Sequence, residues 1–116
     1  MMISPINIIN PVKDVLSHAN HFVNPEILDI TEPPNPRRYL SEFRHERMES
    51  LLLKHKPLDV EKMKNILCNH DNHPQSICRH SDSSLPISQQ TTTRTSMIMD
   101  LKEQSIWCSN GNPCEN

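Results

Sequence analysis

Five residues within a short stretch of the chain carry side chains that bind transition metals. They are Cys68, His70, His73, Cys78 and His80. Thiolate and imidazole groups are ligands that zinc prefers, and a bound ion would add folding free energy to a chain with few apolar residues. The spacing matches no regular zinc finger, because no two of the cysteines are separated by two residues. A small zinc-binding module is therefore an alternative, and the preferred interpretation predicts neither a metal nor any other cofactor.

The cysteine count leaves the redox state of the thiols open. Cys68, Cys78, Cys108 and Cys114 can pair as two disulfides in three ways. The first residues lack the basic segment and continuous apolar segment of a signal peptide, and thiols of proteins that are not secreted usually stay reduced. We expect free thiols and, by default, a cytoplasmic location.

Charge and hydropathy exclude two classes of partner. Twelve Lys and Arg residues against fourteen Asp and Glu residues give a net charge of -2, without a basic run or an aromatic platform. Nucleic-acid binding usually needs such a basic surface. No apolar stretch approaches the ~20 residues of a membrane-spanning helix. We expect neither nucleic acid nor a membrane span.

The apolar content predicts a thin core. Only 34% of the 116 residues are hydrophobic and 3% are aromatic, and ten prolines stand against a single glycine. Little apolar surface is then available to offset the entropy lost on folding. The glycine and an alternating apolar segment both lie within the last twenty residues. This arrangement predicts that the sequence is a piece of a larger protein.

The elements that must position these groups follow from periodicity. The run from Arg38 to Lys54 has no proline or glycine and carries apolar residues at helical spacing, which predicts an amphipathic helix. Asp59 is a predicted N-cap for a second helix that ends near Cys68. Before them, residues 1–16 form a poorly determined lead with one possible helical turn at Val12, Val15 and Leu16. A strand or extended segment is expected from Ala19 to Val23.

The C-terminal third predicts a loop and a hairpin. Residues 69–92 are polar and irregular, whereas Arg94 to Leu101 alternates as a half-buried strand does. Ser105 to Cys108 is the expected second strand, joined by a turn that contains no glycine. Asp100 is expected on the exposed face of its strand, and Trp107 is expected to anchor the core.

Six short motifs, in this order, resemble a known family. They are Asn20-His21-Phe22 with Asn24-Pro25-Glu26, Arg38-Tyr39 before the helix pair, Ser76-Ile77-Cys78-Arg79-His80, Ile98-Met99-Asp100-Leu101, Trp107, and Gly111-Asn112-Pro113-Cys114-Glu115. Over residues 17–116 the chain resembles the C-terminal part of the acyl-coenzyme A:6-aminopenicillanic acid acyltransferase family. Residues 17–116 would then be the C-terminal part of an acyltransferase or amidohydrolase domain.

The resemblance implies an α+β fold of the N-terminal nucleophile hydrolase type, with two antiparallel sheets between helix layers (αββα). In such enzymes a cysteine freed by self-cleavage attacks an amide or thioester carbonyl, and its own α-amino group acts as the base. By position in the motifs, Asn20 would donate to the oxyanion, and Arg79 would order the pocket or a substrate carboxylate.

The nucleophilic cysteine of that family would lie upstream of the Asn-His segment, and none of the four cysteines matches it. We therefore predict that this chain alone is inactive, that its partner is the missing N-terminal half of the same enzyme, and that the substrate is a small acyl amide or acyl thioester. The alternative is a non-catalytic remnant or partner subunit.

Overall fold

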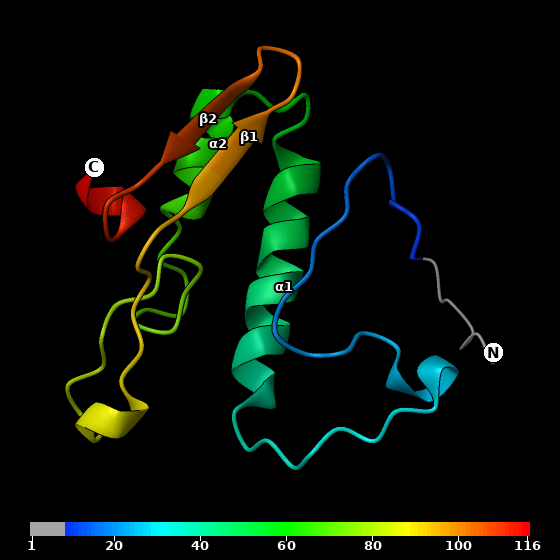
Figure 1. The fold of residues 1–116 in the computed structure, drawn as a ribbon, viewed down its shortest axis with the longest axis vertical. Coiled ribbons are helices and arrows are strands. Elements are labelled where there is room, and N and C mark those ends of the chain that lie inside the picture. The colour runs from blue at the N-terminus through cyan, green and yellow to red at the C-terminus, as the bar shows by residue number, and fades with distance from the viewer. Residues whose placement is uncertain (1–8) are drawn as a thin grey trace, which may run out of the picture. The chain divides into compact units, whose positions relative to one another are not determined.

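The computed structural model describes residues 9–116 and divides the chain into two compact units, Met1–Leu53 and Lys54–Asn116. Half of the predicted lead, residues 1–8, lies outside the described residues. The first unit contains a long helix and the irregular segment before it, and the second contains a short helix and a hairpin (Figure 1). Each unit is described separately below.

The long helix of the first unit, α1, spans Arg38–Lys54, the predicted bounds. It begins after a proline-rich loop and ends before Pro57, because neither prolines nor the residues that precede them favour helical geometry. Leu51 and Leu52 are buried, and with Val15 they form the apolar core of the unit. Ser41 is buried as well, so the helix also buries a polar group, which must find a hydrogen-bond partner.

The segment before α1 differs from its prediction in two places. Val12 and Val15 pair through two backbone hydrogen bonds of 2.9 and 3.1 Å, and Lys13 and Asp14 between them have φ of 50° and 65°. Two successive positive φ values are those of a tight hairpin turn, so the predicted helical turn is wrong. The residues from Ala19 to Val23 are irregular with bends and join no strand ladder, so of the two predicted forms, a strand or an extended segment, the strand is wrong. A 3-10 helix, Pro25–Leu28, follows.

The short helix of the second unit, α2, spans Val60–Leu67. Its start is fixed by Asp59, whose carboxylate accepts a 2.8 Å hydrogen bond from the Lys62 backbone N–H, as the sequence predicted. This bond satisfies one of the N–H groups that a helix start leaves without a partner. Ile66 is the buried apolar residue of the helix.

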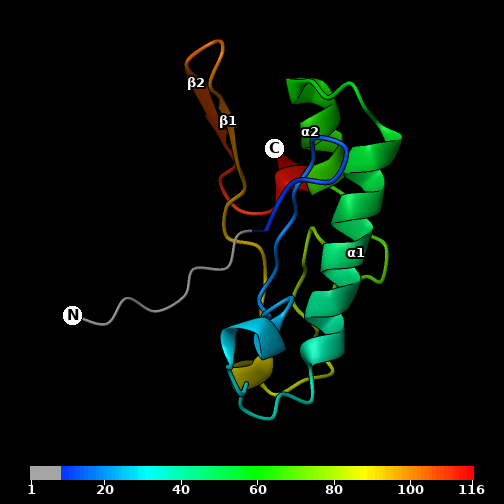
Figure 2. The same cartoon turned by 90° about the vertical axis from the view of Figure 1, so that its right-hand side faces the viewer.

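Strands β1, Met97–Asp100, and β2, Ser105–Cys108, form the predicted antiparallel hairpin, with Ile98 opposite Trp107 and Met99 opposite Ile106. The first strand is shorter than the predicted run from Arg94 to Leu101. The hairpin lies beside α2 in both views (Figure 1, Figure 2). Gln104 takes the left-handed conformation (φ 51°) in which glycine would be less strained.

Two side chains of the hairpin differ from expectation. Asp100 is half-buried, not on the exposed face, and its carboxylate accepts a hydrogen bond from the Glu103 N–H inside the turn. Trp107 is 46% exposed, with the Lys64 ammonium 4.2 Å from its ring centroid. Trp107 therefore contacts the Lys64 ammonium at the surface and does not anchor the core.

The loop between α2 and β1 is irregular, as predicted, apart from a 3-10 helix at Ile87–Gln89, and a last 3-10 helix, Pro113–Glu115, follows the hairpin. The described residues thus make an α+β structure with two helices and one two-stranded antiparallel sheet. Among them, no helix combines the length and the apolar character needed to cross a bilayer.

Candidate functional site

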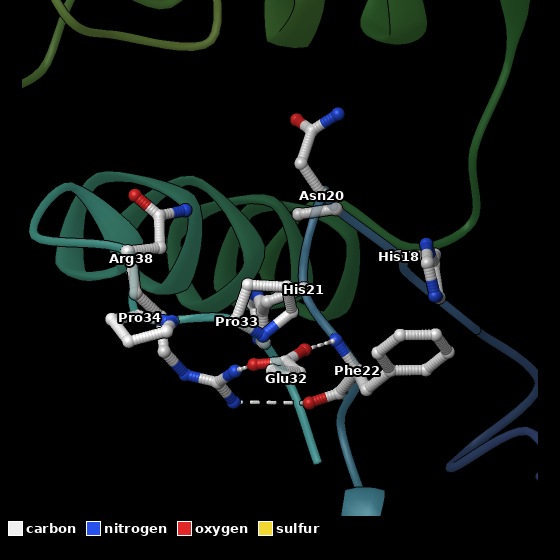
Figure 3. A pocket seen from close by; sticks show the side chains of 10 residues that line it. His18, Asn20, His21, Phe22, Glu32, Pro33, Pro34 and Arg38 are labelled. Atoms are coloured by element: carbon white, nitrogen blue, oxygen red, sulfur yellow. Dashed lines mark hydrogen bonds and ion pairs between the residues drawn. The ribbon is translucent and has the colours of Figure 1, made fainter. Parts of the chain in front are cut away.

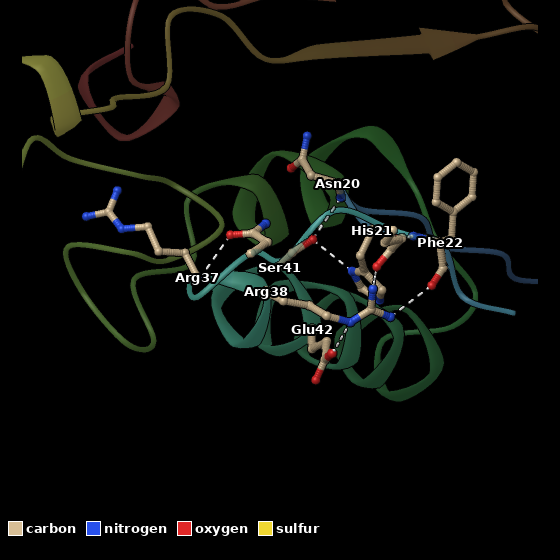
Figure 4. A network of polar contacts seen from close by, with 9 residues as sticks. Asn20, His21, Phe22, Arg37, Arg38, Ser41 and Glu42 are labelled. Carbon is tan, nitrogen blue, oxygen red and sulfur yellow. Dashed lines mark hydrogen bonds and ion pairs between the residues drawn. The ribbon is translucent and has the colours of Figure 1, made fainter. Parts of the chain in front are cut away.

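The segment Asn20–Phe22 is fixed to the first turns of α1 by the buried hydroxyl of Ser41. The Asn20 backbone N–H donates to Ser41 Oγ at 2.8 Å, and His21 Nδ1 lies at the same distance from that oxygen (Figure 4). Ser41 is 5% exposed, so water does not compete with these two bonds. The buried hydroxyl of Ser41 therefore has hydrogen-bond partners, and its bonds fix the position of Asn20 and His21 on α1.

Arg38, the first residue of α1, holds the next residue of the segment. Its guanidinium pairs with Glu32 and Glu42 and donates to the Phe22 carbonyl oxygen at 3.0 Å, while Glu32 accepts from the Phe22 N–H at 2.6 Å (Figure 3, Figure 4). A planar guanidinium with five N–H donors can serve several acceptors at once, which an ammonium group on a flexible stem does less precisely. Both backbone polar groups of Phe22 are thereby occupied.

The side chain of Asn20 is exposed and points away from the Arg38–Glu32 ion pair (Figure 3). Its Oδ1 atom accepts a 3.1 Å hydrogen bond from Arg44 Nη2. Because arginine can only donate, this bond identifies the oxygen end of the amide and leaves the Nδ2 group as the outward-facing donor. The Asn20 backbone is thus held by Ser41, and the oxygen of its side-chain amide is held by Arg44.

Three histidines lie in or near this segment: His21 within it, and His18 and His45 beside it. The His21 and His45 rings meet edge to face with centroids 5.6 Å apart, and His45 Nε2 donates to the Ser17 carbonyl at 3.1 Å. Burial lowers the pKa of His21 below its ordinary value, and the nearby charges of Arg38, His45 and His18 lower it further against the opposing effect of Glu42. The imidazole is therefore more readily neutral than a free one.

An open cavity of about 440 Å³ lies at this segment. It is lined by His18, Ala19, Asn20, His21, Phe22, Glu32, Pro33, Pro34, Asn35 and Arg38. Six of these ten residues are polar or charged, and the rings of Phe22, Pro33 and Pro34 supply most of the apolar wall.

Arg79, the second predicted site residue, belongs to the other unit. Its guanidinium donates to Thr91 Oγ1 at 3.0 Å, and its carbonyl oxygen accepts from Thr92 Oγ1, Thr93 N and Asn112 Nδ2. Arg79 is half-buried, and the hydrogen bonds to its backbone fix the position of its Cα atom.

All four cysteines are free thiols, as expected. Of the five metal-binding side chains considered in the sequence, the structure brings together His70, Cys78 and His80, and it adds Cys114. Cys68 and His73 are outside this group of ligand atoms. Cys114 was missed because its 34-residue separation from His80 leaves no local pattern.

Sequence reasoning also missed the residues that hold the Asn-His motif: Glu32, Arg38, Ser41 and Arg44. One signal was available. Ser41 stands between Leu40 and Glu42 in the predicted helix, and a serine there must either reach solvent or find a hydrogen-bond partner within the fold. The arginines gave no such signal, since charged residues on a helix are usually solvated.

These features define an α+β protein whose candidate site presents an oriented amide donor among histidines. A comparison with protein-family models matches residues 1–115 to the family described as acyl-coenzyme A:6-aminopenicillanic acid acyl-transferase. The chain therefore belongs to this family, which confirms the resemblance of its motifs. A search of the curated proteins finds no match.

Proposed function

We propose that this chain is the C-terminal segment of a cysteine-dependent N-terminal nucleophile enzyme that cleaves or transfers acyl groups at amide or thioester bonds. Family membership supports an acyltransferase or hydrolase-type activity. The observation that carries the proposal is the oriented amide of Asn20, held by Ser41 through its backbone and by Arg44 through its oxygen.

Asn20 is proposed to stabilise the tetrahedral intermediate. When a thiolate adds to the substrate carbonyl, the carbonyl oxygen becomes an anion, and a donor already in place stabilises it without reorganising. The Nδ2 group has this property because the other end of the amide is occupied. Arg79 is proposed to bind or orient a substrate carboxylate, for which a guanidinium is suited.

The nucleophile is proposed to be a cysteine of an upstream stretch, not one of the four in this chain. Cys78 has no exposed surface. Burial raises the pKa of the Cys68 thiol. A raised pKa leaves less thiolate at neutral pH, whereas an acyl-transfer nucleophile needs more.

The outer face of the hairpin supports a larger assembly. Met97, Met99, Ile106 and Cys108 alternate onto one face of the two strands, and all four are exposed. Exposed apolar patches of this kind are usually covered by a partner. We propose that the partner is the N-terminal part of the same enzyme, whose sheets would extend the hairpin.

The test begins with the 116-residue chain alone. Incubated with acyl thioesters and acyl amides, it should show no turnover and no acyl adduct by mass spectrometry. Mapping the 5′ end of the transcript would supply any in-frame upstream stretch for co-expression, which should produce cysteine-dependent turnover. Turnover by the chain alone that disappears when its own cysteines are replaced would overturn the proposed source of the nucleophile.

In the assembled enzyme, Asn20→Ala should lower kcat by about 10²- to 10³-fold with little change in KM, because the lost donor acts in the transition state. Asn10→Ala, at an exposed asparagine of the same unit, is the matched control. A loss of less than threefold in Asn20→Ala would remove Asn20 from the oxyanion role.

A further inference from the structure

Four ligand side chains converge in the second unit. His70, Cys78 and His80 come from the loop after α2, and Cys114 comes from the last 3-10 helix. One nitrogen or sulfur atom of each lies within 4.8 Å of all the others. The set is two imidazoles and two thiols, drawn from segments that are distant along the chain.

The distances from His80 fit the edges of a tetrahedron around one ion. Its Nε2 atom is 3.1 Å from His70 Nε2, 3.7 Å from Cys78 Sγ and 3.5 Å from Cys114 Sγ. Zinc bonds of about 2.0–2.1 Å to nitrogen and about 2.3 Å to sulfur give edges of about 3.3 Å between two nitrogens and about 3.6 Å between nitrogen and sulfur. Each observed distance is within a few tenths of an ångström of its edge.

Hydrogen bonding alone does not account for this convergence. Nε2 of a neutral imidazole has either one N–H or one lone pair, directed outward in the ring plane. It can satisfy one partner well, yet three partners surround the Nε2 atom of His80. A cation placed between the four atoms would accept a lone pair from each of them.

The surroundings hold Cys78 in place. The thiol is fully buried, and Asn112, also buried, donates from Nδ2 to its sulfur at 3.5 Å and to the Arg79 carbonyl at 2.8 Å. The Cys78 carbonyl accepts from the Ser76 hydroxyl at 2.6 Å, and its N–H donates to Asn69. An N–H donor to a cysteine sulfur is a typical outer partner of a metal thiolate, since it stabilises the negative charge.

We propose that His70, Cys78, His80 and Cys114 form a tetrahedral zinc site. Two thiolates and two imidazoles in this geometry select zinc among common divalent ions, and four protein ligands close the coordination shell, as in structural sites. Each thiol gives up its proton on binding, so two protons are released and the two thiolates balance the charge of the ion. His70 and Cys114 are exposed, which gives the ion a path to the site.

The proposed site differs from the set that sequence spacing suggested. Cys68 and His73 are replaced by the single residue Cys114. The site would tie the last 3-10 helix to the loop after α2, in a unit whose only buried apolar side chains among the described residues are Ile66 and Cys78. The ion would thus contribute folding free energy where apolar burial contributes little.

The test uses the full 116-residue chain, purified under reducing conditions and loaded with zinc or cobalt. Elemental analysis should find one zinc per chain. Cobalt should give thiolate charge-transfer absorption with the visible bands of tetrahedral coordination.

Cys114→Ser should weaken zinc binding by at least ~100-fold, and Asn112→Ala by about 10- to 100-fold. His80→Cys should keep the ion and increase the charge-transfer absorption, so a folding defect and a lost ligand are distinguishable.

Cys108→Ser and Cys68→Ser are the matched controls and should bind zinc as the unchanged chain does. Binding that survives Cys114→Ser but is lost in Cys68→Ser would overturn the assignment. So would the absence of stoichiometric zinc, whether the cysteines are then found as thiols or as a Cys78–Cys114 disulfide.

Discussion

The Nε2 atom of His80 lies 3.5 Å from the Sγ atom of Cys114, although 34 positions separate the two residues in the chain. His80 sits in the loop after α2, and Cys114 sits in the last 3-10 helix. This contact joins the C-terminal end of the second unit to the loop after α2, in a unit with a small apolar core. It also means that the stability of the unit should depend on what occupies the space between the two side chains.

Zinc should therefore stabilise the second unit. At a free zinc concentration 1,000 times the Kd, linkage predicts a gain of about 4 kcal/mol in the free energy of unfolding. Urea unfolding in zinc and in chelator would measure the gain, with amide exchange at Cys78 and Thr93 reporting on this unit. The gain should vanish in Cys114→Ser and persist in Cys108→Ser. An equal gain in both variants would contradict the prediction.

Removing the Ser41 hydroxyl should destabilise the first unit. Ser41→Ala leaves the Asn20 N–H and His21 Nδ1 without their buried partner, at a cost of about 1–3 kcal/mol. Amide exchange at Asn20 should accelerate accordingly. Ser50→Ala, at an exposed serine of the same helix, should change stability by less than ~0.5 kcal/mol. Similar effects of the two substitutions would mean that the buried hydroxyl is not needed.

The stability of the first unit should fall in mild acid. Burial first, and then the charge of Arg38, keep the pKa of His21 below 6.5 in the folded chain. The unfolded chain therefore takes up the proton first as pH falls below 6.5, and protonation favours unfolding until pH passes the folded-state pKa. Above that window, His21 adds no pH dependence.

A histidine NMR titration combined with unfolding measured from pH 7.5 to 5 checks this sign. His21→Gln should flatten the slope below pH 6.5. A His21 pKa above 6.5, or an unchanged slope in the variant, would contradict the predicted direction.

Glycine at the hairpin turn should stabilise β1 and β2. Gln104 has a φ of 51°, and left-handed geometry costs a residue with a side chain about 1–2 kcal/mol. Gln104→Gly should raise the free energy of unfolding by about 0.5–1 kcal/mol. The gain is smaller than the strain removed, because glycine has more conformational entropy in the unfolded chain. The population of cross-strand contacts between Met99 and Ile106 in NMR spectra would report the change. Glu103→Gly, where φ is not positive, should destabilise the hairpin instead.

Local patterns predicted the regular elements well. The bounds of α1, the cap of α2 by Asp59 and the pairing of the two strands all follow from residues within one or two turns of each other. Such interactions depend on spacing, which a sequence displays directly. The errors lie at Val12 and Val15, at Ala19 to Val23, at Asp100 and at Trp107, where composition allowed several conformations and the surrounding structure selected one.

The sequence by itself determined the two helices, the hairpin and the family, because helix periodicity, capping and short motifs are properties of neighbouring residues. The tertiary structure alone decided that Arg44 orients the Asn20 amide and that Cys114 joins His80. Those contacts join residues 24 and 34 positions apart, and chain spacing at that range does not specify which side chains meet. Their geometry comes from the packing of loops against helices, and the chemistry proposed for both sites depends on it.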